Sequence, residues 1–205
     1  ATVAYAAKMD YYVLVYYMFG GNIENGATWK AILSMGYAII AAIYIPIVSW
    51  LSRRYGKFTA LKVIFMLSAI GGGAKWFIYT PGVTWLLLLD PILCSAIWTA
   101  MTVIIPVIVA QASDIDREKG EGCREGRFAA IYHLTITFSI MIAILGSGLT
   151  LDLIGFDAHN ATHQTPESLL SMRRILTFGT MLSGVLGIYV LYLFKKRIYT
   201  RSPSN

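Results

Sequence analysis

Apolar and polar positions follow one another in long blocks, and apolar runs of about 20 residues are separated by short polar segments. A bilayer core about 30 Å thick needs about 20 residues of helix to cross it. A spanning backbone must also satisfy its own hydrogen bonds, which favours helices. The pattern predicts an all-α polytopic membrane protein. The six expected spans are residues 3–20, 29–51, 60–79, 84–112, 127–153 and 168–194.

Small residues and prolines recur inside these spans. Glycines and serines allow helix backbones to approach closely, and interior prolines are expected to bend helices. The small residues are Gly71, Gly72, Gly73, Gly146, Ser147, Gly148, Gly179, Ser183, Gly184 and Gly187, and the prolines are Pro46, Pro91 and Pro106.

The composition agrees with a membrane protein and not with a nucleic-acid-binding one. Of 205 residues, 57% are hydrophobic and 14% charged, against about a quarter charged in soluble domains. The net charge of +6 comes from basic residues in short loops, which is typical of cytoplasmic loops beside anionic lipid. Loops 52–59 and 113–126 and the C-terminal segment carry most of them, so we expect these segments, and both ends of the chain, in the cytoplasm at a cell (inner or plasma) membrane.

Signs of catalysis or metal binding are missing from the sequence. Cys94 and Cys123 show no spacing for a disulfide or a metal. His159 and His163 share one loop without further ligands. No H-E-x-x-H motif or paired acid at matched depth occurs. We therefore predict neither an enzyme nor a cofactor or metal site.

Three loop segments carry a family pattern. Residues 109–126 read VAQASDIDREKGEGCREG, residues 51–57 read LSRRYGK, and residues 155–173 begin GFD and continue QTPESLL towards Arg173. Residues 109–126 resemble the loop between helices ten and eleven of the glycoside–pentoside–hexuronide:cation symporters. Residues 51–57 resemble the family's loop between helices eight and nine, and residues 155–173 resemble the start of its helix twelve. The three segments follow one another along the chain in the order and at the spacing of that family. That family belongs to the major facilitator superfamily.

The resemblance covers essentially the whole chain and implies the C-terminal six-helix half of a transporter of twelve helices. Its partners would be the N-terminal six-helix half, the lipid bilayer, a sugar or glycoside, and a coupling Na⁺ or H⁺ bound mainly by the N-terminal half. Such a half consists of two inverted three-helix repeats, here approximately 1–82 and 83–205. The implied function is cation-coupled sugar symport by alternating access.

Polar residues in the fourth and fifth spans are candidates for substrate binding. Tyr132 and His133 match family positions that approach sugar, and Thr137 stands where many members have a lysine. His133 and Thr137 share a helix face; a hydrogen bond between helices explains His133 equally well. Trp98 and Thr102 are also four residues apart, and an aromatic ring beside a polar group suits a sugar. Packing or lipid contact is the alternative for Trp98.

Charged residues suggest a cytoplasmic gate and a coupling position. Ion pairs that form in one state and break in the other can bias alternating access. The candidates for the gate are Asp114, Arg124, Glu125, Arg53 and Arg54. Asp10 lies inside the first span, where an acid is a functional candidate by default, and is a weak candidate for contact with the coupling cation. Lys75 and Asp90 flank the turn near residue 81 and are expected to form an interfacial pair.

Two other functions stay open at this point. A six-helix unit can form a channel or a homodimeric transport subunit, although no selectivity-filter sequence occurs. A facilitator for a solute other than sugar is the second alternative, because a fold does not fix a function.

Overall fold

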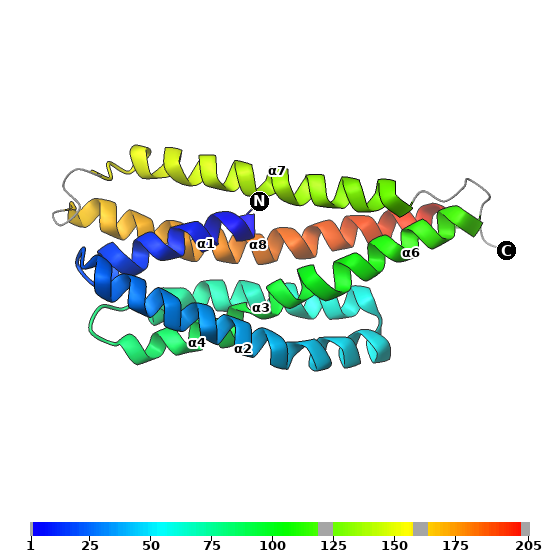
Figure 1. Ribbon diagram of the computed structural model, residues 1–205, viewed down its shortest axis with the longest axis horizontal. Helices are drawn as coiled ribbons and strands as arrows, with labels where there is room; N and C mark the ends of the chain where they lie inside the picture. Colours follow the sequence, from blue (N-terminus) through cyan, green and yellow to red (C-terminus); the bar gives the residue numbers. More distant parts are fainter. Residues whose placement is uncertain (1, 119–124, 158–163, 202–205) are drawn as a thin grey trace.

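The computed structural model describes residues 2–118, 125–157 and 164–201, and within these ranges every regular element is a helix (Figure 1). The chain order is α1 (Thr2–Tyr12), the π-helix η1 (Val13–Met18), α2 (Ile23–Tyr55), α3 (Lys57–Ile78), the 3-10 helix η2 (Thr84–Leu88), α4 (Leu89–Cys94), α5 (Ala96–Thr99), the π-helix η3 (Ala100–Ile104), α6 (Ile105–Glu118), α7 (Glu125–Leu153) and α8 (Pro166–Arg201).

In the described part of the chain, five helical segments are long and apolar enough to cross a membrane. They are Ile23–Tyr55, Lys57–Ile78, Thr84–Asp114, Gly126–Leu153 and Pro166–Phe194. The remaining expected span corresponds to α1 with η1, a shorter helical segment beside the others. The predicted all-α membrane fold is confirmed. The division into repeats 1–82 and 83–205 stays a prediction.

The long helices run side by side and reverse direction at each connection (Figure 1). The turn between α2 and α3, the end of α6, the start of α7 and the end of α8 therefore lie at one end of the bundle, as the alternation of basic segments predicted. The 19–22 and 79–83 turns lie at the opposite end.

The central contact of the bundle joins α3 and α8 through glycine. A Cβ on Gly72 would lie 2.4 Å from the backbone nitrogen of Met181, and a Cβ on Gly184 would lie 2.6 Å from the carbonyl oxygen of Phe65. Side chains at these two positions would force the helices apart. The predicted role of small residues in close helix packing is confirmed for these two glycines, whereas Gly73 and Gly148 have no neighbour within 4 Å of such a Cβ.

The fourth expected span is broken into several helices. A 3-10 turn starts it, Pro91 lies in α4, and the π-helix η3 is followed by α6, whose second residue is Pro106. Proline has no N–H to donate to the preceding turn, so the ladder of hydrogen bonds is interrupted twice. The result is a discontinuous helix whose middle faces the cavity described below.

Arg173 fastens the start of α8 to its neighbours at the non-basic end. Its guanidinium donates to the Tyr17 hydroxyl at 2.6 Å and to the Trp76 carbonyl, and lies 4.2 Å from the centroid of the Trp76 ring. A cation over an aromatic face is stabilised without a carboxylate. This accounts for Arg173, one of two adjacent arginines at the end whose loops carry no basic residues.

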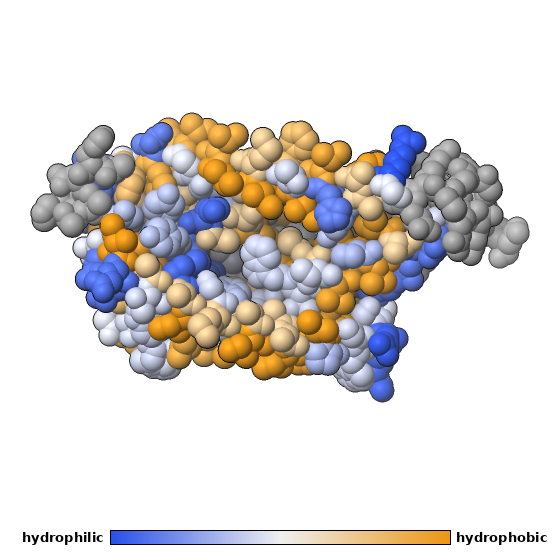
Figure 2. All heavy atoms as spheres, in the orientation of Figure 1, coloured by the Kyte–Doolittle hydropathy of each residue, from blue (hydrophilic) through white to orange (hydrophobic). Residues whose placement is uncertain are grey.

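The outer faces of α2 and α7 are exposed and apolar, which suits contact with lipid. Examples are Met35, Ile39, Ile43 and Trp50 on α2 and Leu134, Phe138, Leu145 and Leu149 on α7. Figure 2 shows apolar side chains over much of one face, with a hollow lined by more polar residues near its middle.

Candidate functional site

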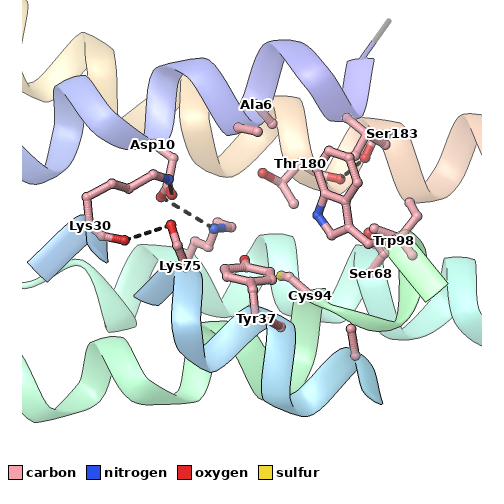
Figure 3. A pocket seen from close by; sticks show the side chains of 16 residues that line it. Ala6, Asp10, Lys30, Tyr37, Ser68, Lys75, Cys94, Trp98, Thr180 and Ser183 are labelled. Atoms are coloured by element: carbon pink, nitrogen blue, oxygen red, sulfur yellow. Dashed lines mark hydrogen bonds and ion pairs between the residues drawn. The ribbon is translucent and has the colours of Figure 1, made fainter. Parts of the chain in front are cut away.

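A cavity of about 340 Å³ opens among the helices (Figure 3). Five parts of the fold line it: α1, α2, α3, the α4–α5 segment and α8. Asp10 and Lys30 lie towards one end of the view, and Trp98 and Ser183 lie towards the other. The lining residues are Val3, Ala6, Ala7, Asp10, Lys30, Ser34, Tyr37, Ala38, Ala41, Ser68, Lys75, Cys94, Ile97, Trp98, Thr180 and Ser183.

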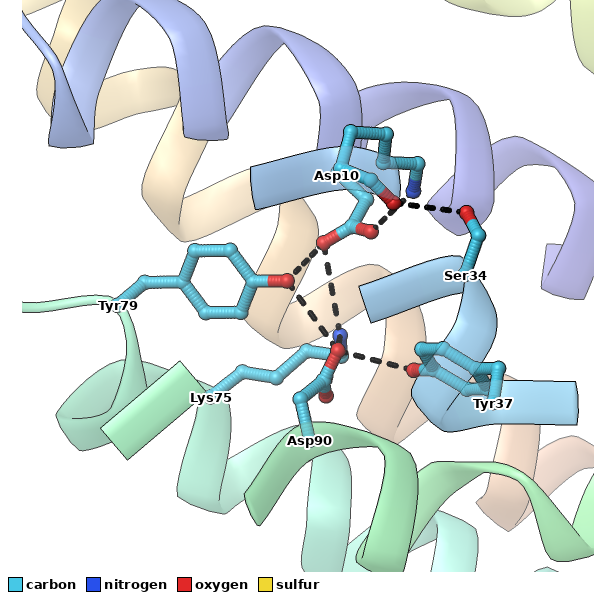
Figure 4. Close-up of polar contacts among 7 residues, drawn as sticks. Asp10, Ser34, Tyr37, Lys75, Tyr79 and Asp90 are labelled. Carbon is cyan, nitrogen blue, oxygen red and sulfur yellow. Dashed lines mark hydrogen bonds and ion pairs between the residues drawn. The ribbon is translucent and has the colours of Figure 1, made fainter. Parts of the chain in front are cut away.

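One end of the cavity borders a group of ion pairs, here called the charge cluster (Figure 4). Its members are Asp10, Lys30, Tyr37, Lys75, Tyr79 and Asp90. The Lys30 ammonium lies 2.6 Å from Asp10 Oδ2, and the Lys75 ammonium lies 2.7 Å from Asp90 Oδ1 and 3.8 Å from Asp10 Oδ1.

Two tyrosine hydroxyls complete the charge cluster. Tyr37 donates to Asp90 Oδ2 at 2.9 Å. The Tyr79 hydroxyl lies within hydrogen-bonding distance of both carboxylates, contacting Asp10 Oδ1 and lying 3.2 Å from Asp90 Oδ2. Since a phenol carries one proton, it donates to one of them at a time. Tyr79 therefore links the two carboxylates, which come from α1 and α4.

The charge cluster is balanced and buried. Two carboxylates face two ammonium groups, and Asp10, Lys75 and Asp90 are 4%, 4% and 0% exposed. Buried charges are tolerated when each is paired, and removal of one partner leaves a costly uncompensated charge. The predicted pairing of Lys75 with Asp90 is confirmed. Its location at a membrane interface stays a prediction; the structure adds that the helices bury the pair inside the bundle, beside Asp10.

The other end of the cavity combines an aromatic ring with hydroxyl groups. The Trp98 side chain is partly exposed, at 39%, and lines the cavity together with Ser68, Thr180 and Ser183. The Thr180 hydroxyl donates to the Leu176 carbonyl at 2.8 Å, which leaves its oxygen lone pairs as acceptors. An apolar ring surface beside hydroxyl acceptors is an arrangement that suits a polyhydroxylated ligand.

Of the five residues predicted to bind substrate, Trp98 lines this cavity. Thr102 lies in η3, and its hydroxyl is near the carbonyl oxygens of Trp98 and Thr99, at 3.1 and 3.3 Å. The other three lie on α7, which contributes no lining residue.

On α7, Tyr132 is half-buried, and its hydroxyl donates to the Met101 carbonyl at 2.9 Å. His133 and Thr137 are exposed, and the Thr137 hydroxyl donates to the His133 carbonyl at 3.0 Å. These contacts join Tyr132 to the discontinuous fourth span and leave the His133 ring on the surface of this chain. The substrate roles of these three residues and of Thr102 stay predictions.

The predicted gate falls partly outside the described residues. Arg124 belongs to residues 119–124, which the structure does not describe, and the side chain of Glu125 is not described either. Asp114 is exposed near the end of α6 and takes part in an interaction. Arg53 and Arg54 are exposed at the end of α2, where the Arg54 guanidinium lies 5.8 Å from the ring centroids of both Trp50 and Tyr55. The gate stays a prediction.

Sequence reasoning singled out Asp10 but missed Lys30 and Tyr79, which contact Asp10, and Tyr37, which donates to Asp90. A usable signal was present. Lys30 and Asp90 carry opposite charges near the ends of apolar runs, as Asp10 and Lys75 do inside them. Intramembrane charges of balanced sign tend to pair with one another. Among the described residues there is no group of three or more His, Cys, Asp or Glu side chains placed to hold a metal ion.

Comparison with known proteins places the chain in a family. No curated protein and no solved structure gives a significant match to the sequence. The sequence profile of the family described as MFS/sugar transport protein matches residues 1–196. That match spans nearly the whole chain and agrees with the helical membrane fold and the cavity. The chain therefore belongs to the family of MFS/sugar transport proteins and is a membrane transporter of the major facilitator superfamily.

Proposed function

We propose that this chain is the C-terminal six-helix half of a sugar or glycoside symporter that works by alternating access with an N-terminal six-helix half. The carrying observation is the cavity, which joins an aromatic ring and hydroxyl groups to a buried set of ion pairs. Sugar and a coupling cation, Na⁺ or H⁺, would bind together and favour the crossing conformation. Such positive coupling between two ligands is the thermodynamic basis of symport.

The helix breaks beside the cavity support this mechanism. The π-helix η1 starts three residues after Asp10, and η3 starts two residues after Trp98. Single π turns inside helices are frequent at functional sites, and transporters commonly bind their substrates at interrupted helices. We expect the two segments to be places where α1 and the fourth span bend as the halves rock.

The loop motifs support the narrower assignment to the glycoside–pentoside–hexuronide:cation symporters and a cell-membrane location. The end of the bundle with the basic segments is proposed to face the cytoplasm. In that orientation Asp114, Arg124, Glu125, Arg53 and Arg54 lie in the cytoplasmic segments, where we propose that they form the gate. Exposed ion pairs contribute about 0–1 kcal/mol each, so several would act together.

Uptake by the full-length transporter in proteoliposomes tests the function. Labelled sugar should accumulate above its outside concentration only when a Na⁺ or proton gradient is imposed, because coupling is required for uphill movement. Dissipating the gradient with an ionophore is the control. Equal sugar entry with and without a gradient would support a facilitator, and entry of ions without sugar would support a channel.

Replacing Trp98 by alanine should raise the sugar concentration for half-maximal uptake by about tenfold, equal to about 1.4 kcal/mol. The reason is the loss of the ring surface that faces the cavity. Trp98→Phe should recover part of the affinity. Trp85→Ala, an exposed tryptophan outside the cavity lining, is the matched control. In the same assay, His133→Ala tests the predicted contact of His133 with the sugar and should weaken sugar binding if that contact exists. Unchanged affinity in Trp98→Ala would remove Trp98 from the substrate site.

A further inference from the structure

The two carboxylates of the charge cluster are neutralised in different ways. Asp90 is fully buried, and the Lys75 ammonium lies 2.7 and 2.8 Å from its two oxygens. The same ammonium is 3.8 Å from Asp10 Oδ1, whereas Lys30 lies 2.6 Å from Asp10 Oδ2. Lys75 is therefore held mainly by Asp90, and Lys30 is the ammonium nearer to Asp10.

Lys30 is the more exposed of the two lysines in the charge cluster. Its side chain is 29% exposed, against 5% for Lys75, and it lines the cavity. A lysine ammonium sits on a flexible four-carbon stem, so it can rotate into an aqueous cavity without a backbone change. Lys75 has no such route, since its exit would leave Asp90 buried without its partner.

Departure of Lys30 would leave a vacancy for one positive charge. With Lys30 in place the two aspartates and two lysines sum to zero. Without it, Asp10, Asp90 and Lys75 sum to −1. Tyr79 still contacts Asp10 Oδ1, so the carboxylate keeps its position while Oδ2 faces the cavity. An uncompensated buried charge is costly, and one monovalent cation would restore the balance.

We infer that the Asp10 carboxylate binds one monovalent cation and that the Lys30 ammonium is its tethered competitor. In the empty carrier Lys30 occupies Asp10; in the loaded carrier Na⁺ or a proton replaces it. The charged and titratable groups that face Asp10 are Lys30 and Tyr37 from α2, Lys75 from α3, Tyr79 directly after α3, and Asp90 from α4. This inference rests on the proposed cation coupling and adds a cation site within this half.

Removal of the competitor tests the inference. Thermal unfolding of the full-length Lys30→Met transporter is measured in detergent in two series. In the first, NaCl replaces choline chloride at constant ionic strength. In the second, the pH is lowered in choline chloride without Na⁺. If Lys30 holds Asp10 about 90% of the time, its loss strengthens the apparent affinity about tenfold. The half-stabilising concentration of Na⁺, or of protons, should therefore fall by about tenfold relative to the unaltered protein. The Na⁺ and pH series distinguish the two ions.

Three variants control the measurement. Asp10→Asn should abolish the part of the Na⁺ or proton response that Lys30→Met strengthens, and it should leave any response of the N-terminal half in place. Lys8→Met removes an exposed lysine from α1 and should leave the midpoints unchanged. Lys30→Gln removes the charge but keeps a donor for Asp10, and it serves if Lys30→Met yields no folded protein.

The result is independent of transport, so loss of gradient-driven sugar uptake would contradict the proposed function without affecting this measurement. Equal cation midpoints with and without the Lys30 ammonium would overturn the inference. The inference would also be overturned if choline chloride stabilised the protein as strongly as Na⁺ and protons do. That result would indicate general screening of charge.

Discussion

Asp90→Asn is expected to destabilise the folded transporter by about 3–5 kcal/mol, the effect of removing one partner of a buried ion pair. Lys75 would lose the carboxylate 2.7 Å away and retain only the more distant Asp10. Its side chain is 5% exposed, so water cannot replace the lost partner. The midpoint of thermal unfolding in detergent measures the effect.

The double variant Asp90→Asn with Lys75→Met separates charge from packing. It removes one positive and one negative charge and leaves the Asp10–Lys30 pair balanced, so it should regain most of the lost stability. Glu24→Gln, at an exposed acid in the first turn of α2, is the control for loss of a carboxylate and should have little effect. A double variant as unstable as Asp90→Asn alone would contradict the electrostatic explanation.

Gly72→Ala is expected to destabilise the protein by about 1–3 kcal/mol, the usual range for overpacking. The added Cβ would lie 2.4 Å from the nitrogen and 2.7 Å from the Cα of Met181. Both are backbone atoms and cannot rotate away, so α3 and α8 must separate along their contact. Thermal unfolding of the full-length protein measures the loss.

Gly73→Ala is the matched control for this change. It lies next in the same helix, and a Cβ there meets nothing within 4 Å. Since alanine is a better helix former than glycine by up to about 1 kcal/mol, this variant should be unchanged or slightly more stable. Equal losses at both positions would show that helix propensity or lipid contact, and not the α3–α8 approach, sets the requirement for glycine.

The helices were predictable because a membrane-spanning segment is defined locally. Each expected span from 29–51 onwards overlaps a long apolar helix, and the loop motifs indicated the superfamily that the sequence profile shows. It was predictable that the fourth span is interrupted, since Pro91 and Pro106 lie in it. The 3-10 helix η2 and the π-helix η3 were not predictable, because their placement depends on neighbouring helices.

The charge cluster was only partly predictable. Asp10 attracted attention because an acid inside an apolar run is expensive. Its grouping with Lys30, Lys75 and Asp90 brings together residues from four helices, up to 80 positions apart along the chain. Lys75 and Asp90 were expected to pair because they flank a turn. Only the packing of α3 against α4 shows that the pair faces inward.

The sequence by itself determined the helical membrane fold, the alternation of basic segments and the superfamily, since these depend on local hydrophobicity and on contiguous motifs. Only the tertiary structure decided that Trp98 lines a cavity while His133 is exposed on another helix, and that Asp10 and Asp90 share Lys75 and Tyr79 as partners. The physical reason is that the direction of a side chain in a helical bundle depends on helix rotation and on helix breaks. Contacts between distant segments set both of these.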